Sequence, residues 1–410
     1  MKNLYFIDLF AGIGGMRLAF ENACKNNNII PICVLTSEIK PYALEVYNKA
    51  FNENNPMIDI TKYSEKQLSK VDFVLAGFPC QPFSYAGKGL GFADTRGTLF
   101  YDVLRFIQFH KPQGFVLENV EGLFSHDKGR TYETIIHLLK QEGYYINAKI
   151  INAIDFDIPQ ERKRIYICGS LKKDIDLSYM PLYGSKFDDI RDYGLKTINS
   201  PFTNKLVQYG QNNELQGKHI RDKRAGDNNI HSWDLELRGN TTTLEKNIMN
   251  YILLERRKKT LAKKYNIIWH DGMPVPLEHI LQKFSTILES DIVFSLDNLI
   301  KNGYLLYKDK YGLKGYDIPT GNLSFPITHI LDNNLPTNTI VATDVSRIGV
   351  IENDNQIRNL STNECLKLFG YPIDWPLNVV NKQKQFDLIG NTICVPVVEF
   401  CCNNTIKSFI

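Results

Sequence analysis

The sequence is poor in the patterns that mark metal centres and disulfide frameworks. Its eight cysteines include no C-x-x-C pair and no companion cluster of histidines, so neither a metal site nor a disulfide-stapled fold is indicated. It also has no run of the roughly 18 apolar residues that a transmembrane helix needs. The chain enters a predicted strand almost at once, which argues against an export signal. We therefore expect a cytoplasmic protein that spans no membrane.

A strong net charge is also missing. The formal charge of +3 at pH 7 is too small by itself to indicate nucleic-acid binding. Basic residues are concentrated instead in residues 218–224 (KHIRDKR) and 255–264 (ERRKKTLAKK). Such runs usually form solvated faces. The length of 410 residues allows two or three domains and a large core.

One cysteine stands in an unusual position. Residues 72–76 (DFVLA) predict a buried parallel strand, and Cys80 follows in residues 77–84 (GFPCQPFS), between two prolines that restrain the backbone. A thiol there would lie at the carboxyl edge of a sheet, where open α/β folds bind their ligands. Taken alone, a cysteine is more often structural, since free cysteines usually behave as small buried hydrophobic residues.

The amino-terminal segment predicts a nucleotide-binding turn. An apolar strand leads into residues 8–15 (DLFAGIGG) and then a helix. A second strand, residues 30–36, ends beside Glu38, which could accept hydrogen bonds from both ribose hydroxyls of an adenosine. The glycines lack the full G-x-G-x-x-G pattern, which favours an adenosine ligand without a diphosphate, such as S-adenosylmethionine. The turn alone is also compatible with NAD.

Two further segments carry charge next to short strands. Residues 114–120 (GFVLENV) predict a buried strand that carries Glu118 near its end, at the same sheet edge as Cys80, and residues 160–164 (QERKR) place Arg162 and Arg164 before another strand. Singly, these are compatible with a surface carboxylate and a solvated charge run.

In this order the segments resemble the DNA (cytosine-5) methyltransferase family, of the bacterial restriction-modification type. The resemblance covers roughly residues 1–170 and 335–400. Residues 336–340 (PTNTI) are similar to the family's proline-threonine element, whereas residues 180–330 match no family-wide pattern. The blocks that carry the resemblance are residues 8–15, 77–84, 96–100 (RGTLF), 118–120 (ENV), 160–164, 360–372 (LSTNECLKLFGYP) and 390–392 (GNT).

The resemblance implies an α/β fold, with the Rossmann-like sheet of S-adenosylmethionine-dependent methyltransferases and a second, smaller target-recognition domain. We expect a catalytic and cofactor-binding domain at residues 1–178, completed by residues 385–410, and a target-recognition domain at residues 179–384. A basic helical insert with a winged-helix-like topology is expected at about residues 240–312. Its predicted elements are one long helix at 243–264, helices at 277–284 and 296–301, and a strand at 303–308.

The family's chemistry explains the residue types. Carbon 5 of cytosine is a poor nucleophile, so a thiolate, here Cys80, first adds to carbon 6. Glu118 would neutralise ring nitrogen 3 and Arg164 would hold the exocyclic oxygen. The target cytosine has to be flipped out of the duplex. The resemblance therefore implies the catalytic residues Cys80, Glu118, Arg162 and Arg164.

The resemblance also implies S-adenosylmethionine as cofactor and double-stranded DNA as partner. The family often has an aromatic residue where this chain has Ile39, which weakens stacking there. The implied cofactor contacts are Phe10, Gly12, Gly14, Gly15, Glu38, Ile39, Asp59, Pro79, Leu99 and Asn391. The implied DNA contacts are Gln81, Ser84, Lys88, Arg96, Arg256 and Arg257.

We predict a monomeric, sequence-specific DNA (cytosine-5) methyltransferase that protects host DNA from a cognate restriction endonuclease, a functional rather than physical partner. A tRNA cytosine-5 methyltransferase is the alternative, although it would need a much smaller central region than residues 180–330. A catalytically inactive DNA-binding relative is a third interpretation, and the intact set of Cys80, Glu118 and Arg164 argues against it.

Overall fold

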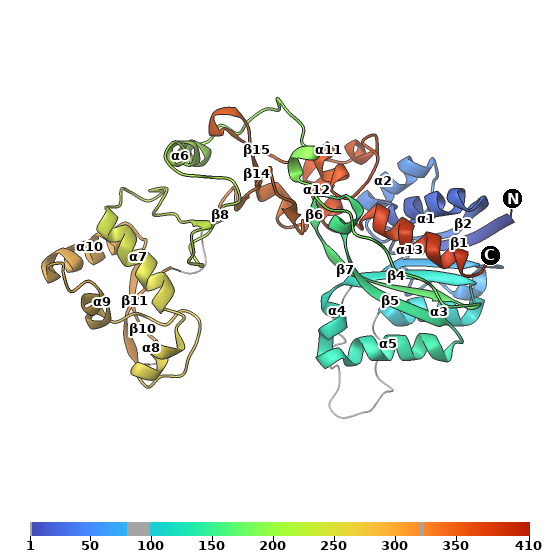
Figure 1. Cartoon of the computed structure of the whole chain (residues 1–410), viewed down its shortest axis with the longest axis horizontal. Helices are drawn as coiled ribbons and strands as arrows, with labels where there is room; N and C mark the ends of the chain where they lie inside the picture. The colour runs from blue at the N-terminus through green and yellow to red at the C-terminus, as the bar shows by residue number, and fades with distance from the viewer. Residues whose placement is uncertain (1, 80–98, 311, 320–323) are drawn as a thin grey trace. The chain divides into compact units, whose positions relative to one another are not determined.

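The computed structural model describes residues 2–79, 99–310, 312–319 and 324–410 (Figure 1). The chain divides into two compact units. Unit 1 comprises Met1–Asp192, Asn334–Val345 and Ser361–Ile410, and unit 2 comprises Tyr193–Asn333 and Ser346–Leu360. This division differs from the predicted boundaries, because residues 179–192, 334–345 and 361–384 pack with unit 1.

Unit 1 is built on a six-stranded sheet with the order β2-β1-β3-β4-β7-β5. The first four strands in that order are parallel, and β7 runs antiparallel to both of its neighbours. The strands predicted at the amino terminus and at 30–36, 72–76 and 114–120 are confirmed. The strands are β1 (Lys2–Leu9), β2 (Ile29–Ser37), β3 (Phe73–Gly77), β4 (Gly114–Val120), β5 (Tyr145–Asn152) and β7 (Lys163–Ser170).

Helices cover both faces of this sheet (Figure 1). On one face α1 (Gly15–Asn26) packs beside α13 (Val395–Lys407), and Phe20 of α1 contacts Phe6 and Phe73 of the strands. On the other face α3 (Leu99–His110) and α5 (Arg130–Gln141) share one apolar core with alternate strand residues. A sheet buried on both faces requires apolar strands, which is why these segments were recognisable in the sequence. The predicted packing of the last helix on the amino-terminal sheet is confirmed.

Segments distant in sequence complete unit 1. The amide of Ile340 donates to Gln160 Oε1 at 3.1 Å, and Gln160 Nε2 donates to the carbonyl of Leu368 at 2.7 Å. These bonds fix the proline-threonine element beside the strand pair β6–β13. The remaining elements of unit 1 are α2 (Pro41–Phe51), α4 (Gly122–Ser125), β6 (Gln160–Glu161), β13 (Thr337–Asn338), α11 (Thr362–Lys367) and α12 (Lys382–Gly390).

In the parts of the chain that the structure describes, no single helix combines the length and apolar character of a membrane span. Within those same residues, the bent pair of α12 and α13 reaches that length and composition jointly.

Unit 2 contains two hydrophobic cores. The first lies under a five-stranded sheet of short strands with the order β15-β14-β12-β8-β9. Its elements are α6 (Pro201–Gly210), β8 (His219–Ile220), β9 (Asn229–Ile230), β12 (His329–Ile330), β14 (Ile348–Ile351) and β15 (Ile357–Asn359).

The second core belongs to the insert, in which helices precede a β-hairpin as predicted; a winged-helix topology stays a prediction. The single long helix predicted at 243–264 is wrong. The chain leaves the helix after Glu255, and the carbonyl of Arg256 accepts a hydrogen bond from Met273 N at 3.0 Å. The elements are α7 (Thr243–Glu255), α8 (Lys259–Lys264), α9 (Leu277–Lys283), α10 (Glu289–Lys301), β10 (Leu306–Lys310) and β11 (Leu313–Asp317).

Arg256 is buried beside this core. The prediction that Arg256 contacts DNA is therefore wrong. Its side chain is 3% exposed, and its Nε lies 2.6 Å from Oδ1 of the fully buried Asp317. Lys308 also pairs with Asp317. A DNA phosphate cannot reach a guanidinium buried in this way, so we assign Arg256 a structural role.

Replacing Arg256 with alanine should lower the free energy of unfolding by about 3 kcal/mol, because it removes one partner of a buried ion pair. This value is at the lower end of the usual range, because Lys308 still pairs with Asp317 in the variant. Chemical denaturation followed by tryptophan fluorescence would measure it, because Trp233 lies in the same core. Arg257→Ala is the matched control. Its partner Asp271 is 61% exposed, so its loss should stay below ~1 kcal/mol. Equal losses in the two variants would contradict the assignment.

Candidate active site

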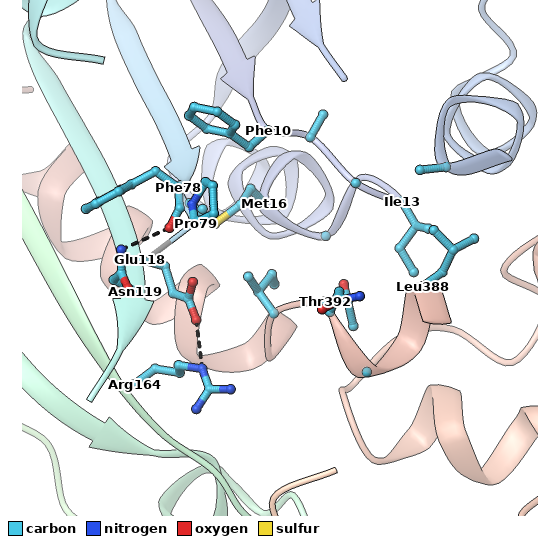
Figure 2. Close-up of a pocket in the computed structure, with 18 of the residues that line it drawn as sticks. Phe10, Ile13, Met16, Phe78, Pro79, Glu118, Asn119, Arg164, Leu388 and Thr392 are labelled. Carbon is cyan, nitrogen blue, oxygen red and sulfur yellow. Dashed lines mark hydrogen bonds and ion pairs between the residues drawn. The ribbon is translucent and has the colours of Figure 1, made fainter. Parts of the chain in front are cut away.

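A cavity of about 540 Å³ opens at the carboxyl ends of β1, β3 and β4 in unit 1 (Figure 2). The segment between α12 and α13 supplies a further wall. This is the edge at which open α/β sheets bind ligands. The predicted site residues that line the cavity are Phe10, Gly12, Gly15, Glu38, Pro79, Glu118, Arg162, Arg164 and Asn391.

The turn after β1 shows why glycines are needed there. Gly12 and Gly14 have φ angles of 54° and 91°, which favour glycine, and Phe10 adopts a strained φ of 57°. A Cβ at Gly15 would lie 2.1 Å from the hydroxyl of Tyr371, whereas one at Gly12 would meet nothing within 4 Å. Gly12 therefore leaves open space beside the cavity, and Gly15 serves close packing.

Glu38 is fixed at the wall of the cavity by backbone amides. Its Oε2 accepts from Gly12 N at 2.8 Å, and its Oε1 accepts from Ile39 N and Lys40 N, each at 2.8 Å. Three of the roughly four acceptor positions of a carboxylate are thus in use. Glu38 can accept about one further hydroxyl without losing a backbone bond, rather than the two that the sequence suggested.

Glu118 lies near the end of β4, beside Gly77 of β3. Burial raises the pKa of its carboxyl, and the charges of Arg162 and Arg164 offset part of that rise. Arg164 Nε lies 3.3 Å from Glu118 Oε1, and both side chains reach the cavity, as Figure 2 shows. A carboxyl with a raised pKa next to a guanidinium can supply a proton and hold negative charge.

Arg162 connects three segments of unit 1. Its Nη1 donates to the carbonyl of Ile340 at 3.2 Å and its Nη2 to that of Thr392 at 2.5 Å. Burial lowers its pKa to about 10, so it keeps its charge at neutral pH. Because both terminal nitrogens are engaged by the backbone, Arg162 is suited to positioning Glu118 and Thr392 rather than to touching a substrate.

Four predicted cofactor contacts do not line the cavity. Gly14 faces Phe51, Ile39 is 62% exposed, Asp59 accepts hydrogen bonds from Thr61, and Leu99 begins α3. The predicted residues Cys80, Gln81, Ser84, Lys88 and Arg96 lie outside the described residues.

The cavity also contains residues that the sequence did not single out. Asn119 Nδ2 donates to the carbonyl of Phe78 at 2.9 Å and thereby ties the end of β3 to β4 beside Pro79 (Figure 2). A polar residue within an apolar strand is a signal that could have found it. Met16, Val341 and Leu388 also line the cavity and gave no such signal, because they are apolar.

The fold is that of a Rossmann-like α/β transferase, with a mostly parallel sheet covered by helices on both faces. Its site lies at the carboxyl edge of the sheet and combines the glycine turn, the carboxylate after β2 and the pair of Glu118 and Arg164. The chain belongs to the family of C-5 cytosine-specific DNA methylases, which it matches over residues 4–407. It is therefore a DNA cytosine-5 methyltransferase.

Similar proteins agree with this assignment. Type II methyltransferase M.NlaIV of Neisseria lactamica is 46% identical over 97% of this chain and 98% of its own length. Type II methyltransferase M.HgiCI of Herpetosiphon aurantiacus is 38% identical over 99% and 98%. Among solved structures, the Dnmt2 methyltransferase of S. pombe has a TM-score of 0.53 at 15% identity and covers 99% of each chain. That structure supports the fold alone.

The predicted family, fold class and enzyme activity are thus confirmed, and the tRNA-modifying and inactive alternatives are not favoured. Among the described residues, no group of three or more His, Cys, Asp or Glu side chains is placed to hold a metal ion.

Proposed function

We propose that this enzyme methylates carbon 5 of a flipped-out cytosine within a specific sequence of duplex DNA, through a covalent adduct with Cys80. The observation that carries the proposal is the buried Glu118, ion-paired with Arg164 in a cavity that Pro79, the residue before Cys80, also lines. This arrangement supplies a proton and a positive charge where a cytosine ring under attack gains negative charge.

We further propose S-adenosylmethionine as the methyl donor. The cavity volume of about 540 Å³ suits a nucleoside-sized ligand. Gly12 leaves one wall open, and Glu38 has acceptor capacity for about one ribose hydroxyl. When bound, this cofactor supplies an electrophilic methyl group. Phe10, Met16 and Phe78 offer apolar contacts at the same wall.

The chain's own residues then perform the following steps. The Cys80 thiolate forms a bond to carbon 6 of cytosine, and Glu118 donates a proton to nitrogen 3, so that an enamine with a nucleophilic carbon 5 results. Arg164 holds the exocyclic oxygen. After methylation, loss of the carbon 5 proton to a base expels Cys80 as thiolate and restores the aromatic ring, and Glu118 regains its proton from nitrogen 3.

The similarity to Type II methyltransferases supports a role as the modification half of a restriction system, with a restriction endonuclease as functional partner. The monomeric state and the cytoplasmic location stay predictions.

Bisulfite sequencing of plasmid DNA from cells that express the protein tests the proposal. We expect unconverted cytosines in one short motif, and their absence from cells that express Glu118→Ala. Transfer of labelled methyl groups from S-adenosylmethionine to purified tRNA but not to the plasmid would contradict it.

We propose that unit 2 selects the DNA sequence. It contains the two basic runs at 218–224 and 255–264 and two cores of its own. A chimera that takes residues 193–333 and 346–360 from a methyltransferase of another specificity should methylate the donor's motif. An active chimera that still methylated the original motif would place recognition in unit 1.

Within unit 2, the exposed residues Lys259 and Lys263 of α8 and the neighbouring Arg257 are suited to phosphate contacts. Replacing all three with alanine should weaken binding to every duplex. It should also reduce the slope of log affinity against log salt by about 2 to 3, since each phosphate contact contributes about 0.9. Fluorescence anisotropy at several salt concentrations measures both effects.

The control for this test removes the same charge elsewhere. Lys25, Lys140 and Lys173 are exposed. Lys25 and Lys140 lie in the last turns of α1 and α5, and Lys173 follows β7, at the amino edge of the sheet and away from the cavity. Their replacement by alanine should leave the slope unchanged. A loss confined to one DNA sequence in the α8 variant would contradict phosphate contact.

A further inference from the structure

Around β8, β9 and β12, the sheet of unit 2 has an apolar face and an opposite face that carries polar residues. Ile220 of β8, Ile230 of β9 and Ile330 of β12 are each at most 1% exposed and share the core beneath the sheet. Since successive side chains of a strand point to opposite faces, the residues beside these isoleucines lie on the other face. That face carries His219 and Arg221 of the basic run at residues 218–224, which the catalytic chemistry does not use.

Four polar residues meet on this face. His219 pairs with His329 of β12 on one side and with Asn229 of β9 on the other. Arg221 follows His219 by two residues and therefore lies on the same face. The strand pairing, rather than closeness in sequence, brings the two histidines together.

The histidine rings are stacked, with centroids 4.2 Å apart and planes 14° apart. Burial, together with the charge of Arg221, lowers the pKa of His219, and burial together with the His219 ring lowers the pKa of His329 to about 4. Both rings are therefore neutral at physiological pH. Each presents one hydrogen-bond donor and one acceptor on a flat, partly exposed surface.

Arg221 is oriented but not neutralised. Its Nε donates to Asn229 Oδ1 at 2.6 Å, and the amide of Asn229 is itself fixed by the carbonyls of Ala225 at 2.9 Å and Gly226 at 3.2 Å. No other hydrogen bond or ion pair joins the side chain of Arg221 to the residues that the structure describes. The two terminal nitrogens of an exposed guanidinium are thus left for a ligand.

Other arginines of unit 2 are arranged differently. Arg256 pairs with Asp317 and Arg358 with Glu352, in both cases as buried ion pairs. The acidic neighbour of Arg221, Asp222, turns away and accepts hydrogen bonds from the amide and hydroxyl of Ser232 at 2.7 and 2.8 Å. Since no carboxylate among the described residues is paired with Arg221, its contribution to the stability of the fold is small.

The surroundings indicate which ligand fits. Lys218, Lys223 and Arg224 lie close to Arg221 in the sequence, so this segment is cationic and suits a polyanion. A guanidinium held at Nε presents its two terminal nitrogens as a fork. That fork matches the two acceptors, O6 and N7, that guanine shows in the major groove.

We propose that Arg221, held by Asn229 and flanked by the stacked His219 and His329, reads a guanine of the recognition sequence. This proposal rests on the proposed function, because it names a base reader of the DNA that the enzyme methylates. The neighbouring lysines contact phosphates and determine the affinity for DNA, whereas Arg221 determines which base is accepted at one position of the recognition sequence.

The test compares wild-type enzyme with Arg221→Ala and Arg221→Lys. Bisulfite sequencing of DNA from expressing cells first gives the wild-type motif. Both variants should then accept other bases at one guanine position, because lysine keeps the charge but loses the fork. Their kcat/KM on the original motif should fall about 5- to 150-fold, the range that corresponds to ~1–3 kcal/mol per bidentate base contact.

Arg224→Ala is the matched control, since it removes an exposed arginine from the same run; it should leave the motif unchanged. Duplexes in which 7-deazaguanine replaces one guanine of the motif at a time supply a second measurement. Wild-type enzyme should lose activity at one position, and Arg221→Ala should be insensitive at that position.

An unchanged motif in both Arg221 variants, or a rate loss that is equal on all sequences, would overturn the proposal. So would wild-type activity that no 7-deazaguanine substitution affects. A wild-type enzyme that methylates no cytosine in DNA would instead contradict the proposed function itself.

Discussion

Replacing Cys80 with serine should reduce methyl transfer by on the order of 10⁴–10⁶-fold and leave DNA binding intact. A serine alkoxide is far harder to form at neutral pH than a thiolate, and carbon 6 of cytosine needs a strong nucleophile. The expectation rests on the position of Cys80 next to Pro79, which lines the cavity that contains Glu118 and Arg164. Single-turnover methyl transfer and DNA binding should be measured on the same preparations.

A mechanism-based substrate provides the complementary measurement. Wild-type enzyme and DNA with 5-fluorocytosine at the target position should form an adduct that survives denaturation, because fluorine cannot leave as a cation. Cys80→Ser should form none. Cys168, a buried cysteine of β7, offers the control substitution Cys168→Ser, which should keep the adduct. Activity of Cys80→Ser within tenfold of wild type would rule out this nucleophile.

Replacing Glu118 with glutamine should lower the rate of the chemical step by about 10²–10⁴-fold, the usual contribution of a general acid, with little change in cofactor affinity. An amide can still donate a hydrogen bond to ring nitrogen 3, so Glu118→Ala should be slower than Glu118→Gln. Glu161, which is exposed on β6, supplies the control Glu161→Gln. Wild-type single-turnover rates in both Glu118 variants would show that the assignment is wrong.

The pH dependence should follow from the raised pKa of Glu118, which burial causes. Because the protonated carboxyl is the active form, the single-turnover rate should fall as the pH rises through that pKa. The descending limb should be absent in Glu118→Gln, since an amide does not titrate.

The sequence predicted those site residues whose chemical type is unusual for their position in the chain. Glu38 and Glu118 interrupt or end apolar strands, and a carboxylate in such a place has few structural reasons to be there. Met16 and Leu388 could not be predicted in the same way. An apolar residue that lines a cavity and one that fills a core have the same local sequence pattern.

Charge runs were a weaker guide. Arg256 and Arg257 are adjacent in one basic run, yet one is buried against Asp317 and the other pairs with the exposed Asp271. Which of two neighbouring arginines turns inward depends on the partner that a distant segment brings. The same contact region breaks the predicted long helix, since Met273 binds the carbonyl of Arg256.

The sequence by itself determined the family, the parallel sheet and the carboxylates at its edge, because strand periodicity and motif spacing are local properties of the chain. Only the tertiary structure decided where the two units divide and that Arg162 donates hydrogen bonds to the carbonyls of Ile340 and Thr392. It also decided that His219, Arg221 and His329 share one face of a sheet. Each of these depends on residues far apart in the chain. Their partners are chosen by packing and strand register, which no local pattern encodes.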